Sequence, residues 1–332
     1  MKIKTLGIIT ALTLTLSACA PVESETIEPF DGLTIVSSTN VWGDIAKSVA
    51  GDGVRVISII DSFGQDPHSY EASARDQLAV NEADIVVANG GGYDSFIDVL
   101  ADAAGGFEIL YAYLPDEHSE EEATAEESTE DGHDHGHENE HSEEEATAEE
   151  STEDGHDHGH ENEHVWYDFH VVEDFATRLA EQLGTLDPDG ATEYAENLVE
   201  FLGEMERLQD DVAMAGQNYQ GYSVVSSEPV ADYLIDALGF ENVTPSEFSQ
   251  AIEEETDLSP KVLLEVQQLL KNKLVKLFVV NSQTGSSQID SLVALAKDNG
   301  IAVVEMSELL PEGISYSEWM HNNILSIDTA LN

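Results

Sequence analysis

The stretch GHDHGHENEHVWYDFH, residues 155–170, places five histidines within sixteen positions. Imidazole nitrogens bind transition-metal ions such as zinc, and neighbouring acidic side chains can add oxygen ligands. Two interpretations are open at this point. Either the rings together form one metal site, or they form a solvated tract that has a single ordered ligand at its end.

The segment that contains these histidines is duplicated letter for letter. SEEEATAEESTEDGHDHGHENEH occupies residues 119–141 and recurs at 142–164. Residues 116–164 carry 22 acidic groups, nine histidines and no Lys or Arg. No residue of the repeated unit is more apolar than alanine, so the unit cannot build a packed core, and its charges repel one another. We therefore predict a disordered loop over residues 116–163.

The charge of the whole chain also favours the binding of cations. It has 68 Asp plus Glu against 12 Lys plus Arg, a formal net charge of -56. Such a surface repels nucleic acid and anionic lipid headgroups, and it attracts cations.

The N-terminus has the features of a bacterial export signal. Lys2 and Lys4 precede a mostly apolar run, residues 6–16, which is shorter than the roughly 20 residues that span a bilayer. The following LSAC resembles a lipobox, which implies acylation of Cys19 and cleavage before it; a signal without lipidation is the alternative. Cys19 is the only cysteine, so any metal site must use His, Asp and Glu.

Elsewhere the chain alternates between predicted strands and helices. The predicted strands are 33–39, 54–60, 83–90, 107–113, 222–227, 275–282 and 301–307. Helical patterns separate them, which favours an α/β fold with parallel-type sheets flanked by helices. Apolar residues recur at helical spacing from 191 to about 217, and we predict that this long rigid helix joins two α/β lobes. Ligands of such folds bind at the carboxyl ends of strands.

Four residues near such positions could bind a divalent transition metal: His68, His164, Glu228 and Glu308. Each has an ordinary alternative. His68 could be a turn residue and His164 the last member of a solvated tract. Glu228, which precedes a proline, could be a first-turn acid stabilised by a helix dipole, and Glu308 is one acid among many. Spacing alone does not assemble the four into one site.

Six ordered motifs resemble a known family. STNVWGDIAKSVAGD, DPHSYE, ADIVVANGGGYDSF, HVWYD, SSEPVADYL and SELLPEG, followed by YSEWMHNN, are similar to the zinc- and manganese-binding lipoproteins of ABC importers, the cluster A-I substrate-binding proteins. The resemblance covers nearly the whole chain from about residue 33. It implies two α/β lobes joined by one long helix, with the metal bound between them by His68, His164, Glu228 and Glu308.

The sequence departs from the family at two of these positions. Many zinc-binding members have histidine where this chain has Glu228, and many members have aspartate where it has Glu308. Glu305 and Glu312 are nearby carboxylates that could replace Glu308. Two further polar residues, Asn281 and Gln283, could orient the ligands through hydrogen bonds or form an ordinary polar turn.

Zinc is favoured over manganese because the duplicated tract is rich in imidazole. We interpret six histidines as a weak metal-collecting loop: His133, His135, His137, His156, His158 and His160. His164 adjoins the apolar VWY and is expected to be ordered, whereas Ser142 follows the equivalent His141. His170 is expected at a helix start.

The resemblance therefore implies a non-enzymatic, extracytoplasmic protein, anchored to the cell membrane through Cys19, that captures zinc or manganese and delivers it to an ABC permease. We expect a monomer that does not bind nucleic acid. A metal-storage or adhesion lipoprotein is the alternative, and a metallohydrolase is disfavoured because four protein ligands would leave the metal no open position for water. The predicted segments are a signal peptide (1–18), a lipid-anchored linker (19–30), the N-terminal lobe (31–115 and 164–188), the loop (116–163), the linking helix (189–217) and the C-terminal lobe (218–332).

Overall fold

The computed structural model describes residues 30, 32–65, 67–114, 162–254 and 256–332. The predicted signal peptide, Cys19 and the six histidines of the collecting loop lie outside these ranges, and so does nearly all of the linker and the loop. Within the described ranges, no helix combines the length and the apolar character needed to cross a bilayer. The predicted segment boundaries stay predictions.

The first lobe is built on a parallel four-stranded sheet in the order β2-β1-β3-β4. Its strands are β1 (Thr34–Thr39), β2 (Arg55–Ile60), β3 (Ile85–Ala88) and β4 (Ile109–Tyr111). Every residue of β1 and β3 is buried, because helices cover both faces of a parallel sheet. The helices of this lobe are α1 (Asn40–Ala50), α2 (Ala74–Asn81) and α3 (Phe96–Ala103).

The second lobe repeats this arrangement with strand order β6-β5-β7-β8, again all parallel. Its strands are β5 (Ser223–Ser226), β6 (Glu241–Asn242), β7 (Leu277–Asn281) and β8 (Ala302–Met306). Its helices are η3 (Pro229–Ala231), α6 (Asp232–Ala237), α7 (Ser246–Glu253), α8 (Pro260–Lys271), α9 (Ser287–Asp298) and α10 (Tyr316–Leu331). The predicted α/β class with two parallel sheets is confirmed.

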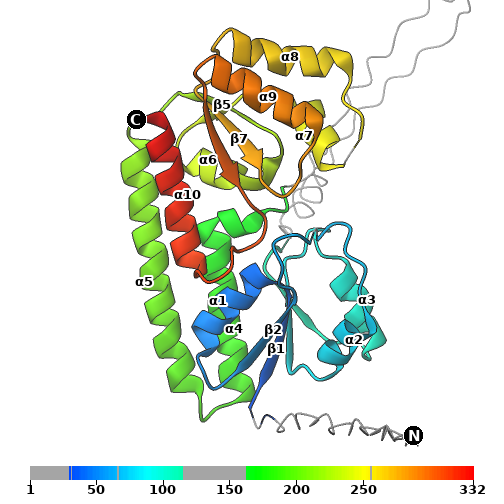
Figure 1. Cartoon of the computed structure of the whole chain (residues 1–332). Coiled ribbons are helices and arrows are strands. Elements are labelled where there is room, and N and C mark those ends of the chain that lie inside the picture. Colours follow the sequence, from blue (N-terminus) through cyan, green and yellow to red (C-terminus); the bar gives the residue numbers. More distant parts are fainter. Residues whose placement is uncertain (1–29, 31, 66, 115–161, 255) are drawn as a thin grey trace, which may run out of the picture. The chain divides into compact units, whose positions relative to one another are not determined.

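A long helix connects the two sheets (Figure 1). After the short helix η2 (Val165–Tyr167) and α4 (Phe169–Leu186), helix α5 (Ala191–Gly216) runs for 26 residues. It packs against α4, against α1 of the first lobe, and against α6 and α10 of the second. Its buried face includes Tyr194, Phe201 and Met205, and it belongs to one hydrophobic cluster that reaches both sheets. This shared core makes the linking helix a packed element rather than a free tether.

Two elements of the second lobe were not predicted from the sequence. Strand β6 is only two residues long, and helix α7 buries a single residue, Phe248. Neither has enough buried apolar positions to generate a visible periodicity, so only pairing with β5 and packing against α8 define them.

The segment after β8 is fastened to the first lobe. Leu309 is fully buried in the cluster that covers the outer face of the first sheet. The side chain of Asn40 donates a hydrogen bond to the carbonyl of Leu310 (2.8 Å) and accepts one from its amide (3.0 Å). Tyr167 donates to the carbonyl of Ser307 (2.9 Å). These contacts bring Glu308, which lies between Ser307 and Leu309, to the carboxyl ends of the first sheet.

Candidate metal centre

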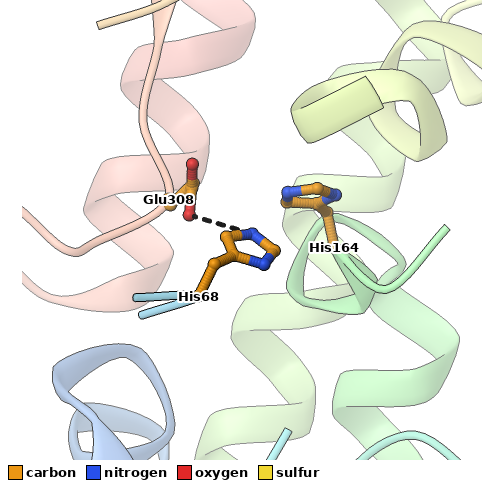
Figure 2. A group of neighbouring side chains, drawn as sticks. All are labelled: His68, His164 and Glu308. Atoms are coloured by element: carbon orange, nitrogen blue, oxygen red, sulfur yellow. Dashed lines mark ion pairs between the residues drawn. The ribbon is translucent and has the colours of Figure 1, made fainter. Parts of the chain in front are cut away.

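Three side chains from separate parts of the chain converge on one point. One ligand atom each of His68, His164 and Glu308 lies within 4.8 Å of the other two. Figure 2 shows the ring of His68 between the carboxylate of Glu308 and the ring of His164. Two imidazoles and a carboxylate at this spacing form a donor set that suits a divalent transition metal.

His68 lies in the loop after β2. Its Nε2 is 3.9 Å from Glu308 Oε2, and its Nδ1 is 3.3 Å from Glu163 Oε1. The edge of its ring faces Tyr93, with ring centroids 5.0 Å apart. Its side chain is 31% exposed, whereas His164 and Glu308 are almost completely buried. Among the three converging residues, His68 is therefore the one that solvent reaches.

His164 is positioned by the residues around it. The following residues, Val165, Trp166 and Tyr167, form η2 and are buried, which anchors the histidine at the edge of the core. Its Nδ1 is 2.8 Å from Asn162 Oδ1, so this nitrogen is the donor and Nε2 keeps its lone pair. Nε2 is buried and has no hydrogen-bond partner among the described residues. Buried polar atoms without a partner are uncommon, and a bound cation would account for this one.

Glu308 is the carboxylate that reaches the two rings. It is 3% exposed and accepts hydrogen bonds from Tyr93 (3.1 Å to Oε2) and from Asn281 Nδ2 (2.7 Å to Oε1). Glu305 and Glu312, the alternatives suggested by the sequence, are both exposed. The burial of Glu308 beside the imidazoles makes it the carboxylate of the group.

Glu228 is close to the group without belonging to it. It is 3% exposed, and its Oε2 accepts a hydrogen bond from Asn281 Nδ2 (2.7 Å), the same nitrogen that serves Glu308. Its Oε1 accepts a hydrogen bond from the hydroxyl of Thr284. These two donors orient the carboxylate toward the end of β7, and the three-residue group does not include it.

Asn281 and Gln283, the two polar residues expected to orient the ligands, both contact the candidate ligand residues. Asn281 bridges Glu228 and Glu308, as described above. The side-chain oxygen of Gln283 accepts hydrogen bonds from the backbone amides of Glu308 (2.7 Å) and Leu309 (2.9 Å). Gln283 therefore supports the backbone that carries the carboxylate, while Asn281 contacts the carboxylates themselves.

Burial shifts the pKa values of rings and carboxyl groups in opposite directions. Burial, together with the nearby His68, lowers the pKa of His164 to about 3. Burial is also the main cause that raises the pKa of Glu228, and repulsion from Glu308 adds to it. Burial and the neighbouring acids raise the pKa of Glu163 to about 8 and that of Glu253 to about 7. A divalent cation would offset this repulsion between carboxylates, so the electrostatics suit cation binding.

Sequence reasoning missed four residues of this site: Asn162, Glu163, Tyr93 and Thr284. The first two belong to ENEH, which occurs twice in the acidic tract, so nothing in their type separated them from solvated neighbours. Tyr93 follows three glycines that all have positive φ, Gly90 to Gly92. This turn was a usable signal, because it folds back after β3 and buries the tyrosine beside the histidines.

His170 was also considered from the sequence. His170 is the second residue of α4, and its side chain is 85% exposed. It is a surface residue near a helix start, as the sequence predicted.

Two parallel α/β lobes on one long helix, with imidazoles and carboxylates meeting at the carboxyl ends of their strands, define a substrate-binding protein for a cation. The model of the family described as "Zinc-uptake complex component A periplasmic" (ZnuA) matches residues 35–330, so the chain belongs to this family. The family is made of substrate-binding transport proteins, which confirms the prediction that the chain is not an enzyme.

Two lipoproteins and one solved structure are among the proteins that are similar to this chain. The manganese-binding lipoprotein MntA of Halalkalibacterium halodurans is 26% identical over 280 residues, 78% of this chain and 79% of that protein. The manganese ABC transporter substrate-binding lipoprotein PsaA of Streptococcus pneumoniae is 25% identical over 356 residues, 98% and 97% of the two chains. The structure of the laminin-binding protein Lmb of Streptococcus agalactiae, described as an adhesin with metal-transporting activity, has a TM-score of 0.66 at 22% identity, covering 91% of this chain and all of that one.

Proposed function

We propose that this protein captures one divalent transition-metal ion at His68, His164 and Glu308 and delivers it to an ABC permease. The observation that carries the proposal is the buried Nε2 of His164, which has no hydrogen-bond partner among the described residues and lies beside a second imidazole and a carboxylate. Family membership supports the transport role, and PsaA is named as a component of an ABC transporter.

Glu228 is proposed as the fourth ligand. It shares the amide nitrogen of Asn281 with Glu308, so the two carboxylates already face a common donor. A cation bound to the other three ligands would attract the Glu228 carboxylate away from Thr284. Four protein ligands would enclose the ion, which suits capture better than catalysis, since catalytic zinc keeps one position open for water.

Zinc is proposed ahead of manganese. Two imidazoles and one carboxylate form a donor set found in zinc sites, and zinc is intrinsically bound more tightly than manganese. Manganese is the second candidate, because MntA and PsaA are named for it and carboxylate oxygens suit it.

Native mass spectrometry of the purified protein with equal concentrations of zinc and manganese tests both parts of this proposal. We expect one tightly bound zinc per chain. A single manganese would reverse the choice of metal, and the absence of any tight ion would refute the proposed function. The favoured metal should also stabilise the fold by about 4 kcal/mol at a thousandfold excess over its Kd.

The location and the anchor are proposed on the sequence together with the relatives, MntA and PsaA being named as lipoproteins. We expect an extracytoplasmic monomer that is attached to the membrane by a lipid on Cys19. Mass spectrometry of the mature N-terminal peptide checks this directly. A Cys19→Ala variant that still partitions with membranes would contradict the lipid anchor.

The histidine tract is proposed to act as a weak collecting loop that is separate from the tight site. The matched test deletes residues 119–161, which removes the loop histidines and keeps Asn162, Glu163 and His164. Weak binding should disappear, and the tight ion should remain with an unchanged Kd. Loss of the tight ion would mean that the tract supplies ligands to the site. A smaller deletion, residues 119–141, removes one repeat and leaves the same ENEHVWYD junction.

Adhesion or metal storage is the second candidate, which the description of Lmb and the duplicated tract both support. Storage predicts many sites of similar affinity, whereas capture predicts one site far tighter than the rest. Calorimetric titration with zinc distinguishes the two by stoichiometry.

A further inference from the structure

Two consecutive residues contact the two imidazoles on the sides that face away from Glu308. Asn162 Oδ1 lies 2.8 Å from Nδ1 of His164. Glu163 Oε1 lies 3.3 Å from Nδ1 of His68, whose Nε2 faces Glu308. One short segment therefore places an oxygen acceptor against the same nitrogen of each ring.

We propose that Asn162 and Glu163 are positioning residues that fix both rings as the tautomer protonated on Nδ1, so that both Nε2 lone pairs point into the metal site. A neutral imidazole has one donor nitrogen and one acceptor nitrogen, and an oxygen acceptor beside Nδ1 keeps the proton there. The use of these lone pairs for a metal rests on the proposed function, whereas the tautomers themselves do not.

The backbone of this segment is bonded to both lobes. The side chain of Asn89, after β3, donates to the carbonyl of Glu163 (2.8 Å). The side-chain amide of Asn162 donates to the carbonyl of Pro229 (2.9 Å), and the backbone carbonyl of Asn162 accepts from the hydroxyl of Tyr233 (2.8 Å). The two acceptors therefore occupy defined positions relative to residues of the first and the second sheet.

The glycine turn after β3 lies against the side chain of Glu163. Gly91 and Gly92 have φ values of +67° and +99°. A Cβ added at Gly91 would lie 3.5 Å from Glu163 Cβ, and one at Gly92 would lie 3.7 Å from Glu163 Oε2. The glutamate side chain therefore packs along this turn, which directs its carboxylate toward His68.

The two rings need these acceptors to different degrees. His164 is 1% exposed and is packed against Trp166 and Tyr93, with centroid distances of 5.2 and 5.9 Å. His68 is 31% exposed and lies on a loop. Packing alone orients His164, so Asn162 mainly selects its tautomer, while Glu163 both orients the ring of His68 and selects its tautomer.

The test is two-bond 1H–15N NMR of the imidazoles in the metal-free protein at pH 8.5, well above the ordinary pKa of histidine. His68→Asn and His164→Asn variants assign the two rings. We expect a proton on Nδ1 of both rings in the wild type. Glu163→Ala should give a mixed or reversed tautomer at His68 alone, while Glu163→Gln, which keeps a side-chain oxygen, should restore the wild-type signal.

Zinc affinity, measured by chelator competition at the same pH, provides the second readout. Loss of a residue that orients a metal-binding histidine typically costs 10–100-fold in affinity. We expect a weakening in this range for Glu163→Ala, a change within about threefold for Glu163→Gln, and no change for Glu305→Ala, which alters an exposed glutamate on β8.

Three results would overturn the inference: a proton on Nε2 of His68 in the wild type, an unchanged tautomer in Glu163→Ala, or equal loss of zinc affinity in the Ala and Gln variants. A wild-type chain that shows the expected tautomers and binds neither zinc nor manganese would support the inference and refute the proposed function.

Discussion

The two halves of the proposed metal site are built from opposite chemistry. The nitrogen donors, His68 and His164, come from the part of the chain before α4, and the carboxylates, Glu228 and Glu308, follow strands of the second sheet. Each ring has its own oxygen acceptor and aromatic neighbours, whereas the two carboxylates share one amide group, that of Asn281. Each imidazole is therefore positioned by its own neighbours, whereas the two carboxylates are positioned together by Asn281.

Burial affects the two halves in opposite ways and prepares both for a cation. It lowers the pKa of His164 to about 3, so this ring is already neutral at pH 7 and has no proton to lose. It raises the pKa of Glu228, because burial disfavours the charged form of this carboxyl group, and a bound cation would offset that cost.

The largest effect is expected from the nitrogen half. His164→Asn removes the buried Nε2 and leaves a shorter amide beside Asn162. We expect Kd for zinc to rise roughly 1000-fold, about 4 kcal/mol, measured by chelator competition. His170→Asn is the matched control, because that histidine is exposed on α4. If His164→Asn still bound zinc like the wild type, the histidine would be a core residue and the proposed ligand set would fail.

The oxygen half is tested next by Glu308→Gln, which keeps the size of the side chain and removes its negative charge. We expect roughly a 100-fold loss of zinc affinity, about 3 kcal/mol. Glu305→Gln and Glu312→Gln change exposed carboxylates near the same strand and should bind as the wild type does. A large loss in either control would mean that one of those residues is the ligand.

Asn281→Ala tests whether the two carboxylates act as a pair. Removing the shared amide leaves Glu228 and Glu308 without a common donor, so each can move independently. We expect about a 10-fold loss of affinity, the lower end for residues that orient ligands. Gln283→Ala, which removes backbone support for Glu308 and not the carboxylate contact, should have a smaller effect. The reverse order would show that the backbone, rather than the amide bridge, positions the oxygen half.

The smallest effect is expected in the pH dependence of the stability of the metal-free protein. Burial, with repulsion from Glu228 and Glu308, raises the pKa of Glu253 from 4.5 to about 7. The folded state therefore binds this proton more tightly than the unfolded state does, and the resulting stability is present below pH 4.5 and lost as the pH rises through about 7. Glu253→Gln should stabilise the metal-free protein by about 1 kcal/mol at pH 8, after allowance for solvent screening, and leave its stability unchanged at pH 4.

Urea denaturation of the metal-free protein at the two pH values measures this difference. Glu254→Gln, a change at the exposed neighbouring residue, is the control. A Glu253→Gln variant with the pH profile of the wild type would mean that Glu253 does not take part in the electrostatics of the site.

Much of the fold was predictable because its strands are buried on both faces. Continuous apolar runs such as IVVA and LFVV separated by amphipathic helices predict parallel sheets, and the 26-residue helix α5 was visible as one unbroken helical period. Strand β6 and helix α7 were missed because each depends on its neighbours more than on its own sequence pattern. Few elements of the observed fold therefore contradict the local sequence pattern.

The site was predictable only in part. The family resemblance implied His68, His164, Glu228 and Glu308, with Glu305 and Glu312 as alternatives to Glu308. Composition could not distinguish Glu308 from Glu305 and Glu312, because all three are glutamates close to the end of one strand. Nor could it show that Asn162 and Glu163 contact the two rings, since the same letters occur 23 residues earlier in the repeat.

The sequence by itself determined the two parallel sheets, the long connecting helix and a supply of nitrogen and oxygen donors, because hydrophobic periodicity and residue chemistry are local properties. Only the tertiary structure decided which donors meet, because that depends on contacts between distant residues. Leu309 and the Asn40–Leu310 pair fasten the segment after β8 to the first lobe, and this attachment turns Glu308 toward His68 and His164.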